Sequence, residues 1–226
     1  MTASIEALGD CALLIQLGAH LDARLAAQAT VLAAALRAAQ LQGVLDIAPA
    51  YASVCVRYLP VHADARERLA DAIRPFLEDP APAAAATAMP LEIPVCYGGD
   101  YGPDLDDVAR HAQVDADAVI ARHAGAEYRV AMLGFAPGFP YLLGLHASLH
   151  TPRRGSPRTR VPAGAVAIGG AQTGIYPREL PGGWNIVGRT PLRLFDVARD
   201  PPALLAAGMH VRFRAIDAAE FAALSQ

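Results

Sequence analysis

The sequence predicts an α+β protein with two domains, a small N-terminal sandwich of helices on a sheet and a C-terminal β domain of barrel type. Strands interleave with two helices in the first part of the chain, which favours the sandwich. Short apolar runs between Gly and Pro turns dominate the last part, which favours a closed sheet. A segment rich in Ala and Pro without apolar periodicity separates the two parts. We therefore predict domains at residues 1–80 and 90–226, joined by a linker at 81–89.

The predicted N-terminal domain begins with two strands around the turn pair Gly9-Asp10. Leucines then recur at helical spacing from Leu21 in an alanine-rich run, and Gly43 is a suitable helix stop. Two further strands and a second helix follow, and we expect both helices on one face of the sheet. The expected strands are 4–8, 12–17, 44–48 and 53–59, and the second helix is 63–77.

The predicted C-terminal domain begins with a strand at 91–95, followed by two short helices. Asp104 and Asp115 are the expected N-caps of these helices, which should end at His111 and His123. After this point the pattern becomes short strands between Gly and Pro turns. The expected strands are 128–133, 165–169, 192–196 and 210–215.

Composition excludes several classes of function. With 54% hydrophobic residues, 18% charged residues and a net charge of -3, the chain is globular and not basic enough to have nucleic acid as its main partner. All 19 basic residues are arginine. The chain therefore has no lysine for a phosphate loop, for a Schiff base with pyridoxal phosphate or for covalent biotin, and any such group must come from another chain.

The cysteines and the apolar runs indicate a cellular compartment. Three cysteines are scattered singly without a Cys-x-x-Cys spacing, which fits a reducing environment. The N-terminus has no basic flank before an apolar block, and no apolar stretch reaches transmembrane length. These features predict a soluble cytoplasmic protein that is not bound to a membrane.

The stretch 134–191 combines Pro, Gly, Arg and aromatic residues with almost no acids, which is typical of loops that form a site. Four of its arginines lie within eight residues, where prolines stiffen the backbone. Such a loop can clamp an anion at roughly 1.5–3 kcal/mol per charged hydrogen bond, but the four arginines taken alone slightly favour a solvated basic loop. The four arginines are Arg153, Arg154, Arg158 and Arg160.

Polar and aromatic side chains follow the arginines and suit a small-molecule pocket. Gln172, Tyr176 and Asn185 supply neutral donors and acceptors, and Trp184, the sole tryptophan, supplies an apolar wall. Glycine pairs beside them would let backbone N–H groups approach an anion, although each pair is also compatible with an ordinary turn.

Two titratable residues are candidates for proton transfer. Asp100 lies among glycines and tyrosines that could bury it and raise its pKa, but it also fits a turn aspartate that bonds its own backbone. His150 adjoins the arginine loop. The seven histidines show no metal-ligand spacing beside a third ligand, so we expect no bound metal and no covalent cofactor in this chain.

Five ordered blocks of this sequence closely resemble the allophanate hydrolase subunit 1 family, whose members include the B subunit of 5-oxoprolinase and the sporulation kinase inhibitor KipI. The family more often has Glu-Phe where this chain has Asp100-Tyr101, which keeps the carboxylate but shortens its reach. We also assign Arg189, which lies in the last block, to ligand binding. The blocks are 97–105, 134–141, 156–164, 171–177 and 181–191.

The resemblance implies an N-terminal ferredoxin-like α/β sandwich and a C-terminal cyclophilin-like β-barrel. It also implies a function as the B subunit of an ATP-dependent 5-oxoprolinase, acting with the A and C subunits to open the lactam 5-oxo-L-proline to L-glutamate. The chain would be inactive alone, and ATP would be shared with the partner subunits. In this interpretation Arg153, Arg158 and Arg160 stabilise an anionic group, and Asp100 or His150 moves a proton.

Two other functions stay open on the sequence. The family contains a KipI-like inhibitor of histidine kinase autophosphorylation, but nothing in the residues selects a kinase partner. The same module also occurs in the carboxyltransferase part of urea carboxylase and allophanate hydrolase systems, with which the absence of lysine is compatible. A prolyl isomerase ranks last, because a cyclophilin-like fold does not by itself carry that activity.

Overall fold

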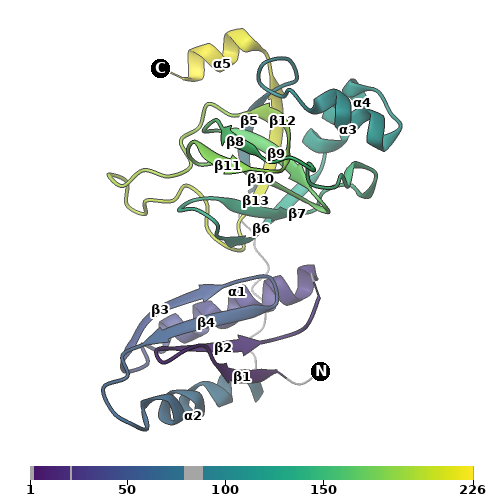
Figure 1. Cartoon of the computed structure of the whole chain (residues 1–226). Helices are drawn as coiled ribbons and strands as arrows, with labels where there is room; N and C mark the ends of the chain where they lie inside the picture. The colour runs from purple at the N-terminus through teal and green to yellow at the C-terminus, as the bar shows by residue number, and fades with distance from the viewer. Residues whose placement is uncertain (1–2, 21, 79–88, 226) are drawn as a thin grey trace. The chain divides into compact units, whose positions relative to one another are not determined.

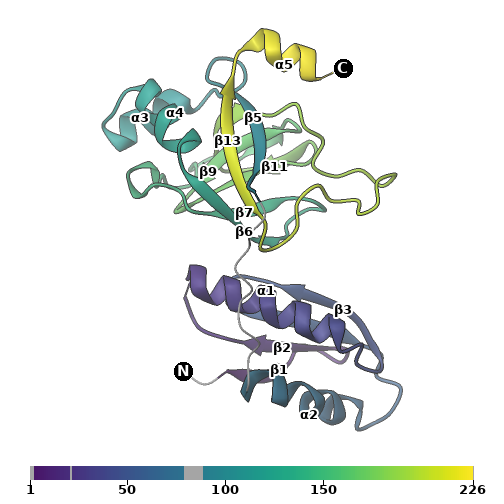
Figure 2. The same cartoon turned by 180° about the vertical axis from the view of Figure 1, so that it is seen from behind.

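A computed structural model describes residues 3–20, 22–78 and 89–225 of the 226-residue chain (Figures 1 and 2). The chain divides into two compact units, Met1–Ala86 and Thr87–Gln226. The segment expected as a linker, 81–89, lies outside the described residues except for Met89, as does Leu21 at the expected start of the first helix.

The N-terminal unit is a four-stranded antiparallel sheet with two helices (Figure 1). Asp22 begins the first helix, because its side chain accepts a hydrogen bond from the Arg24 backbone N–H at 2.6 Å. The strand order is β1-β2-β4-β3. The elements are β1 (Ser4–Ala7), β2 (Ala12–Gln16), α1 (Ala23–Ala38), β3 (Val44–Pro49), β4 (Ser53–Tyr58) and α2 (Ala65–Glu78).

Both helices of this unit cover the same face of the sheet, as expected. Alternate residues of β2 and β4 enter one core cluster with apolar residues of α1 and α2. The chain order is ββαββα, whereas a ferredoxin-like sandwich runs βαββαβ. The edge strand that comes last in that arrangement is here the first, β1, so the fold is a permuted form of the sandwich.

The C-terminal unit is a closed barrel of seven strands in the order β10-β7-β6-β13-β5-β12-β9, so the predicted α+β class and β-barrel are confirmed (Figures 1 and 2). The barrel strands are β5 (Leu91–Tyr97), β6 (Glu127–Leu133), β7 (Pro140–Leu143), β9 (Ala165–Gly169), β10 (Gln172–Ile175), β12 (Asn185–Arg189) and β13 (His210–Ile216). β13 pairs with β5 in parallel and with β6 in antiparallel orientation.

Smaller elements decorate the barrel. Strands β8 (Arg158–Val161) and β11 (Leu180–Gly182) form a separate two-stranded sheet. Helices α3 (Leu105–Ala112) and α4 (Ala116–Ala124) contribute Leu105, Val108 and Val119 to the main core of the barrel. A 3-10 turn η1 (Ala147–Leu149) and the terminal helix α5 (Ala218–Leu224) complete the unit.

The expected strand at 192–196 is wrong. This segment is irregular and has one isolated bridge, between Phe195 and Ala203. The facing segment contains Pro201 and Pro202, which have no N–H to donate, so a regular ladder cannot form there. The strands β7, β8, β10, β11 and β12 were not expected, because each is short and most contain Gly or Pro.

Candidate functional site

The arginine loop is held to the barrel by one buried carboxylate. Asp104 is 2% exposed and accepts hydrogen bonds from Arg154 Nη1 at 2.6 Å and from Arg158 Nη1 and Nη2 at 2.7 and 2.8 Å. Its Oδ2 also accepts from the Ile186 backbone N–H at 2.8 Å. Asp104 therefore joins the loop to β12, and hydrogen bonding to it raises the pKa of Arg158 above its ordinary value.

Asp104 begins α3 as expected, but its carboxylate is used elsewhere. Asp104 occupies the N-cap position of α3, but its side chain makes no capping hydrogen bond. Its two oxygens are used instead by the two guanidinium groups and the backbone of β12. Asp115, by contrast, caps α4 as expected, accepting from the Ala118 N–H at 2.7 Å.

The same unit contains a group of aromatic rings that we call the Trp184 cluster: Phe135, Phe139, Tyr141, Tyr176 and Trp184. Phe139 is its centre, with ring centroids 5.1 Å from Tyr176 and 5.7 Å from Trp184 in edge-on geometry. Tyr141 lies 5.8 Å from Trp184. Trp184, Tyr176 and Phe139 are buried, so these rings form a packed aromatic core, and Phe135 is the exposed member of the cluster.

Two glycines allow the cluster to pack. A Cβ at Gly169 would lie 2.6 Å from the Trp184 indole, and a Cβ at Gly182 would lie 2.2 Å from the Tyr176 hydroxyl. These glycines belong to the pairs 169–170 and 182–183, whose backbone N–H groups were expected to approach an anion. In the structure their missing side chains admit aromatic rings.

Arg153 differs from its three neighbours in the loop. Its Cζ lies 5.9 Å from the centroid of the Trp184 ring, a cation–π contact. Within the described part of the chain it has no hydrogen-bond or ion-pair partner, whereas Arg154 and Arg158 bind Asp104 and Arg160 binds Glu179 at 2.8 Å. Arg153 is thus an exposed guanidinium, fixed on an aromatic surface and open to an incoming anion.

The positive charge of Arg153 affects the pKa values of two nearby tyrosines, Tyr141 and Tyr176. Burial raises the pKa of both Tyr141 and Tyr176, and Arg153 opposes that shift at both. A hydrogen bond from the Trp184 backbone also lowers the pKa of Tyr176. The Arg153 guanidinium therefore interacts electrostatically with both tyrosine hydroxyls.

The other predicted site residues are placed as follows. Asn185 donates from Nδ2 to the Pro152 carbonyl at 2.8 Å and to the Ile168 carbonyl at 3.2 Å, so its amide ties the loop to β9. Gln172 is buried in β10. His150 is exposed, with Nε2 3.3 Å from the Leu145 carbonyl oxygen. Asp100 is exposed in the turn after β5.

Arg189 does not belong to the Trp184 cluster. Its Nε donates to the Ala163 carbonyl at 2.8 Å, and its Cζ lies 5.9 Å from the Phe221 ring of α5. The predicted set is therefore divided: Arg153, Tyr176 and Trp184 come together, Arg158 and Asn185 support them, and Arg189 lies at a different groove. The roles of all these residues remain predictions.

Phe135 is a member of the site that sequence reasoning did not single out. It is 61% exposed and has φ +68°, which is unusual for a residue with a bulky side chain. The Ala136 N–H donates to the Gly134 carbonyl at 2.8 Å, so Phe135 is the central residue of a strained γ-turn. The turn projects the ring beside Phe139 and Tyr176, with centroids 5.5 and 6.4 Å away.

The role of a buried histidine was also not predicted, because His123 was expected only as the end of the helix that Asp115 caps. The His123 ring is fully buried, with Nδ1 2.8 Å from the Tyr97 hydroxyl and Nε2 3.0 Å from Thr173 Oγ1. Thr173 donates to the Ala167 carbonyl, so it accepts from Nε2–H, and Tyr97 donates to Nδ1. Burial lowers the pKa of His123 to about 3, so the ring is neutral.

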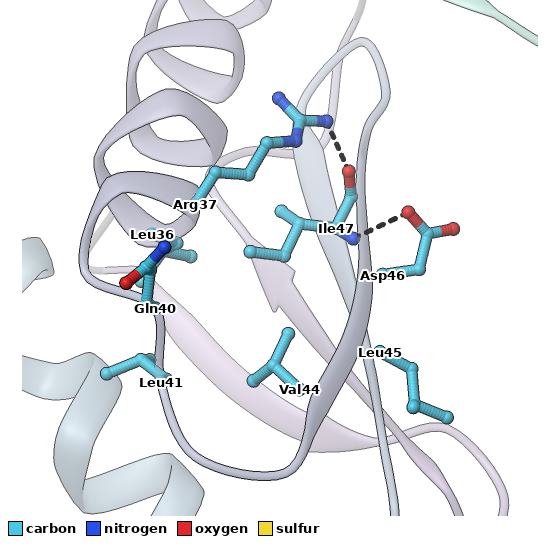
Figure 3. Close-up of a pocket in the computed structure, with 8 residues that line it drawn as sticks. All are labelled: Leu36, Arg37, Gln40, Leu41, Val44, Leu45, Asp46 and Ile47. Atoms are coloured by element: carbon cyan, nitrogen blue, oxygen red, sulfur yellow. Dashed lines mark hydrogen bonds between the residues drawn. The ribbon is translucent and has the colours of Figure 1, made fainter.

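The N-terminal unit has a separate hollow of about 410 Å³ between the end of α1 and strand β3 (Figure 3). There Arg37 donates to the Ile47 carbonyl, and Asp46 Oδ1 accepts from the Ile47 N–H at 2.9 Å. These side chains occupy the free edge of β3 and protect it from pairing with another strand. The hollow is open and lacks convergent free polar groups, so we do not regard it as the site.

Two further findings concern the described residues. No three His, Cys, Asp or Glu side chains gather there in a way that would hold a metal ion. In the same residues, none of the helices has the length and apolar character needed to cross a membrane.

Comparison with known proteins places the chain among carboxyltransferase-type proteins. Residues 3–205 match the family described as carboxyltransferase domain, subdomain C and D. The chain is 38% identical to the 5-oxoprolinase B subunit of Bacillus subtilis (strain 168), covering 98% of this chain and 96% of that protein. The protein of the same name from Escherichia coli O157:H7 is 57% identical over 123 residues, which are 54% of this chain and 56% of that protein.

Solved structures agree with this placement. TTHA0988 superposes with a TM-score of 0.80 at 38% identity, over 91% of this chain and 40% of that chain. The chain therefore spans about two fifths of TTHA0988. The Kluyveromyces lactis urea carboxylase, at 20% identity and a TM-score of 0.71, shares the fold over 98% of this chain and 22% of its own. With its full-length match to a named 5-oxoprolinase component and its closed barrel, this chain belongs to the carboxyltransferase domain subdomain C and D family, as a relative of the B subunits of 5-oxoprolinases.

Proposed function

We propose that this chain is the B subunit of an ATP-dependent 5-oxoprolinase and that it acts with the A and C subunits to hydrolyse 5-oxo-L-proline to L-glutamate. The observation that carries the proposal is the 38% identity to a 5-oxoprolinase B subunit across nearly the whole of both chains. The site lies on the C-terminal unit, and the chain works in the cytoplasm as part of a hetero-oligomer.

The chemistry explains the need for ATP. A lactam carbonyl is a poor electrophile, because the amide nitrogen delocalises its lone pair into it. Transfer of the γ-phosphoryl group of ATP to the lactam oxygen releases ADP and makes that oxygen part of a leaving group. Water then adds to the activated carbon, and the ring C–N bond opens as the nitrogen leaves with a proton, which gives an acyl phosphate. A second water hydrolyses the acyl phosphate to glutamate and inorganic phosphate. Each step places negative charge on oxygen, which a fixed cation stabilises.

Arg153 is the residue that we propose for this task. It has no carboxylate partner among the described residues, and the Trp184 ring holds it in place. The Trp184 cluster supplies apolar aromatic rings beside this guanidinium, and its exposed member Phe135 suits contact with the apolar face of a small ring.

Arg158, Arg160 and Asn185 have supporting roles in this proposal. Arg158 is bound to Asp104, so we assign it to positioning of the loop rather than to direct contact with substrate. Arg160 is exposed and pairs with Glu179, and Asn185 holds the backbone at Pro152. Asp100 and His150 are our candidates for proton transfer, because both are exposed to an incoming substrate or partner.

An omission experiment tests the function. 5-Oxoproline-dependent ATP hydrolysis is measured with this chain and the A and C subunits together, and then with each omitted. We expect turnover only in the complete mixture, and none from this chain alone. A rate that does not change when this chain is left out contradicts the proposal.

A carboxyltransferase subunit is the second candidate, favoured by the family match over residues 3–205. It would transfer a carboxyl group to an amide from biotin carried by another chain, since this chain has no lysine. Product analysis separates the two candidates. The first forms glutamate and inorganic phosphate from 5-oxoproline, and the second forms a carboxylated amide only when a biotinylated protein is present.

A further inference from the structure

The C-terminal unit has a groove whose lining includes none of the five residues of the Trp184 cluster. It has a volume of about 540 Å³ and is bounded by helix α5, the β10–β11 loop and the segment after β12. Its lining combines three arginines with two phenylalanines and one acid, Glu179. The arginines are Arg178, Arg189 and Arg193, and the aromatic residues are Phe195 and Phe221.

The three guanidinium groups differ in how many of their nitrogens are free to bind a ligand. Arg178 is exposed and has no hydrogen bond or ion pair within the described part of the chain. Arg189 uses Nε for the Ala163 carbonyl, which leaves both of its terminal nitrogens for a ligand. Arg193 pairs through Nη1 with Asp196 at 2.9 Å. Glu179 is bound by Arg160, so it does not neutralise the groove.

The aromatic side of the groove is held in place. Phe221 lies under the Arg189 guanidinium at 5.9 Å and packs against Tyr101, with ring centroids 4.7 Å apart. Phe195 backs onto Gly138, where an added Cβ would lie 2.8 Å from the Phe195 Cβ. The groove thus joins a cationic edge to a flat apolar wall, and its parts come from four separate segments of the chain.

Charge and size select the class of ligand. Two free guanidinium groups and a third that is partly used favour a ligand with several negative charges over a monocarboxylate. The volume lies in the range of pockets for drug-sized ligands and exceeds what a single five-membered lactam fills. Aromatic rings beside arginines suit a planar base joined to phosphates.

We propose that this groove binds a nucleoside triphosphate, with its phosphates at Arg178 and Arg189 and its base against Phe195 and Phe221. The inference rests on the proposed function and deepens it, since it assigns part of the ATP site to this chain and separates that part from the lactam surface at Arg153.

The test uses the assembled enzyme with Arg178→Gln, Arg189→Gln and the double variant. We expect the KM for ATP to rise about 3- to 10-fold for each single variant and further for the double variant, with the KM for 5-oxoproline unchanged. Arg24→Gln, at a 91% exposed side chain of the N-terminal unit, is the matched control and should leave both constants unchanged. Equilibrium dialysis of radiolabelled ATP should show the same order of affinities.

Two outcomes overturn the inference. One is a double variant that retains the KM for ATP and the dialysis affinity of the unsubstituted enzyme. The other is an equal rise in both KM values, which indicates a structural effect. Failure of the proposed function is a different result, because it appears as ATP hydrolysis that does not require this chain, while dialysis still reports whether the groove binds nucleotide.

Discussion

Both terminal nitrogens of Arg158 donate to the carboxylate of Asp104, at 2.7 and 2.8 Å, in a two-pronged pair across 54 residues of sequence. Asp104 begins helix α3 and Arg158 begins strand β8, so the pair joins a helix to the arginine loop. An arginine that looks like an anion clamp in the sequence is therefore occupied by an internal anion.

Asp104→Asn should destabilise the C-terminal unit. The substitution removes the negative charge that Arg154 and Arg158 share, and these arginines are only 32% and 26% exposed. Loss of one partner from a buried pair costs about 3–5 kcal/mol, and the partial exposure of the arginines brings our expectation to about 2–3 kcal/mol. Urea unfolding followed by the fluorescence of the sole tryptophan, Trp184, measures this change.

The matched control is Asp107→Asn, three residues further along α3. Asp107 pairs with Arg110 at 2.8 Å, but both side chains are more than half exposed. The free energy of unfolding should change by no more than about 0.5 kcal/mol. Equal effects of the two substitutions would refute the view that Asp104 stabilises the unit by joining the arginine loop to β12.

Gly169→Ala should disturb the Trp184 cluster. The new Cβ would lie 2.6 Å from the indole, so the ring must move, at a cost of about 1–3 kcal/mol. We expect a shifted tryptophan emission maximum and reduced turnover in the assembled enzyme. Gly155→Ala is the control, because no atom lies within 4 Å of its Cβ position. An unchanged emission spectrum in Gly169→Ala would count against the packing described.

Arg153→Gln and Arg160→Gln should separate two arginines that the sequence treats alike. Arg153 is free of carboxylates among the described residues, and its replacement should lower kcat/KM for 5-oxoproline about 10- to 100-fold, equivalent to one charged hydrogen bond. Arg160 pairs with exposed Glu179, and its loss should change kcat/KM less than about 3-fold. Steady-state kinetics of the assembled enzyme decide this, and equal effects would disprove the assignment.

Stability of the C-terminal unit should fall as the pH drops below about 6.5. His123 has a pKa of about 3 when folded, against 6.5 for an ordinary histidine, so the unfolded chain takes up a proton that the folded unit excludes. Its stabilising contribution is complete above pH 6.5 and is lost as the pH falls toward 3, with a slope approaching about 1.4 kcal/mol per pH unit. Urea unfolding at pH 7.5, 6 and 5 measures the slope.

His123→Gln should flatten the dependence between pH 7.5 and 5, even if the variant is less stable throughout. His20→Gln, at an exposed histidine of the N-terminal unit, should retain it. If the slope persists in His123→Gln, another group is responsible for the pH dependence.

The architecture follows in large part from local patterns. Apolar periodicity predicts α1, a capping aspartate predicts α4, and alternating residues predict β4, because each pattern acts over one or two turns or pleats. Short glycine-containing strands such as β10 and β12 carry no such pattern. They are strands because the closed barrel supplies their hydrogen-bond partners, and closure is a property of the whole unit.

The sequence by itself determined the α+β class and the family, since these depend on composition, local periodicity and ordered motifs. Only the tertiary structure decided which arginine is free. Arg153, Arg154 and Arg158 are chemically alike and adjacent in sequence, but their charges are distinguished by Asp104, about 50 residues away, which chain folding brings to two of them and not to the third. Electrostatic pairing depends on distance in space and not along the sequence, so the folded position of Asp104 determines which arginines of the loop are paired.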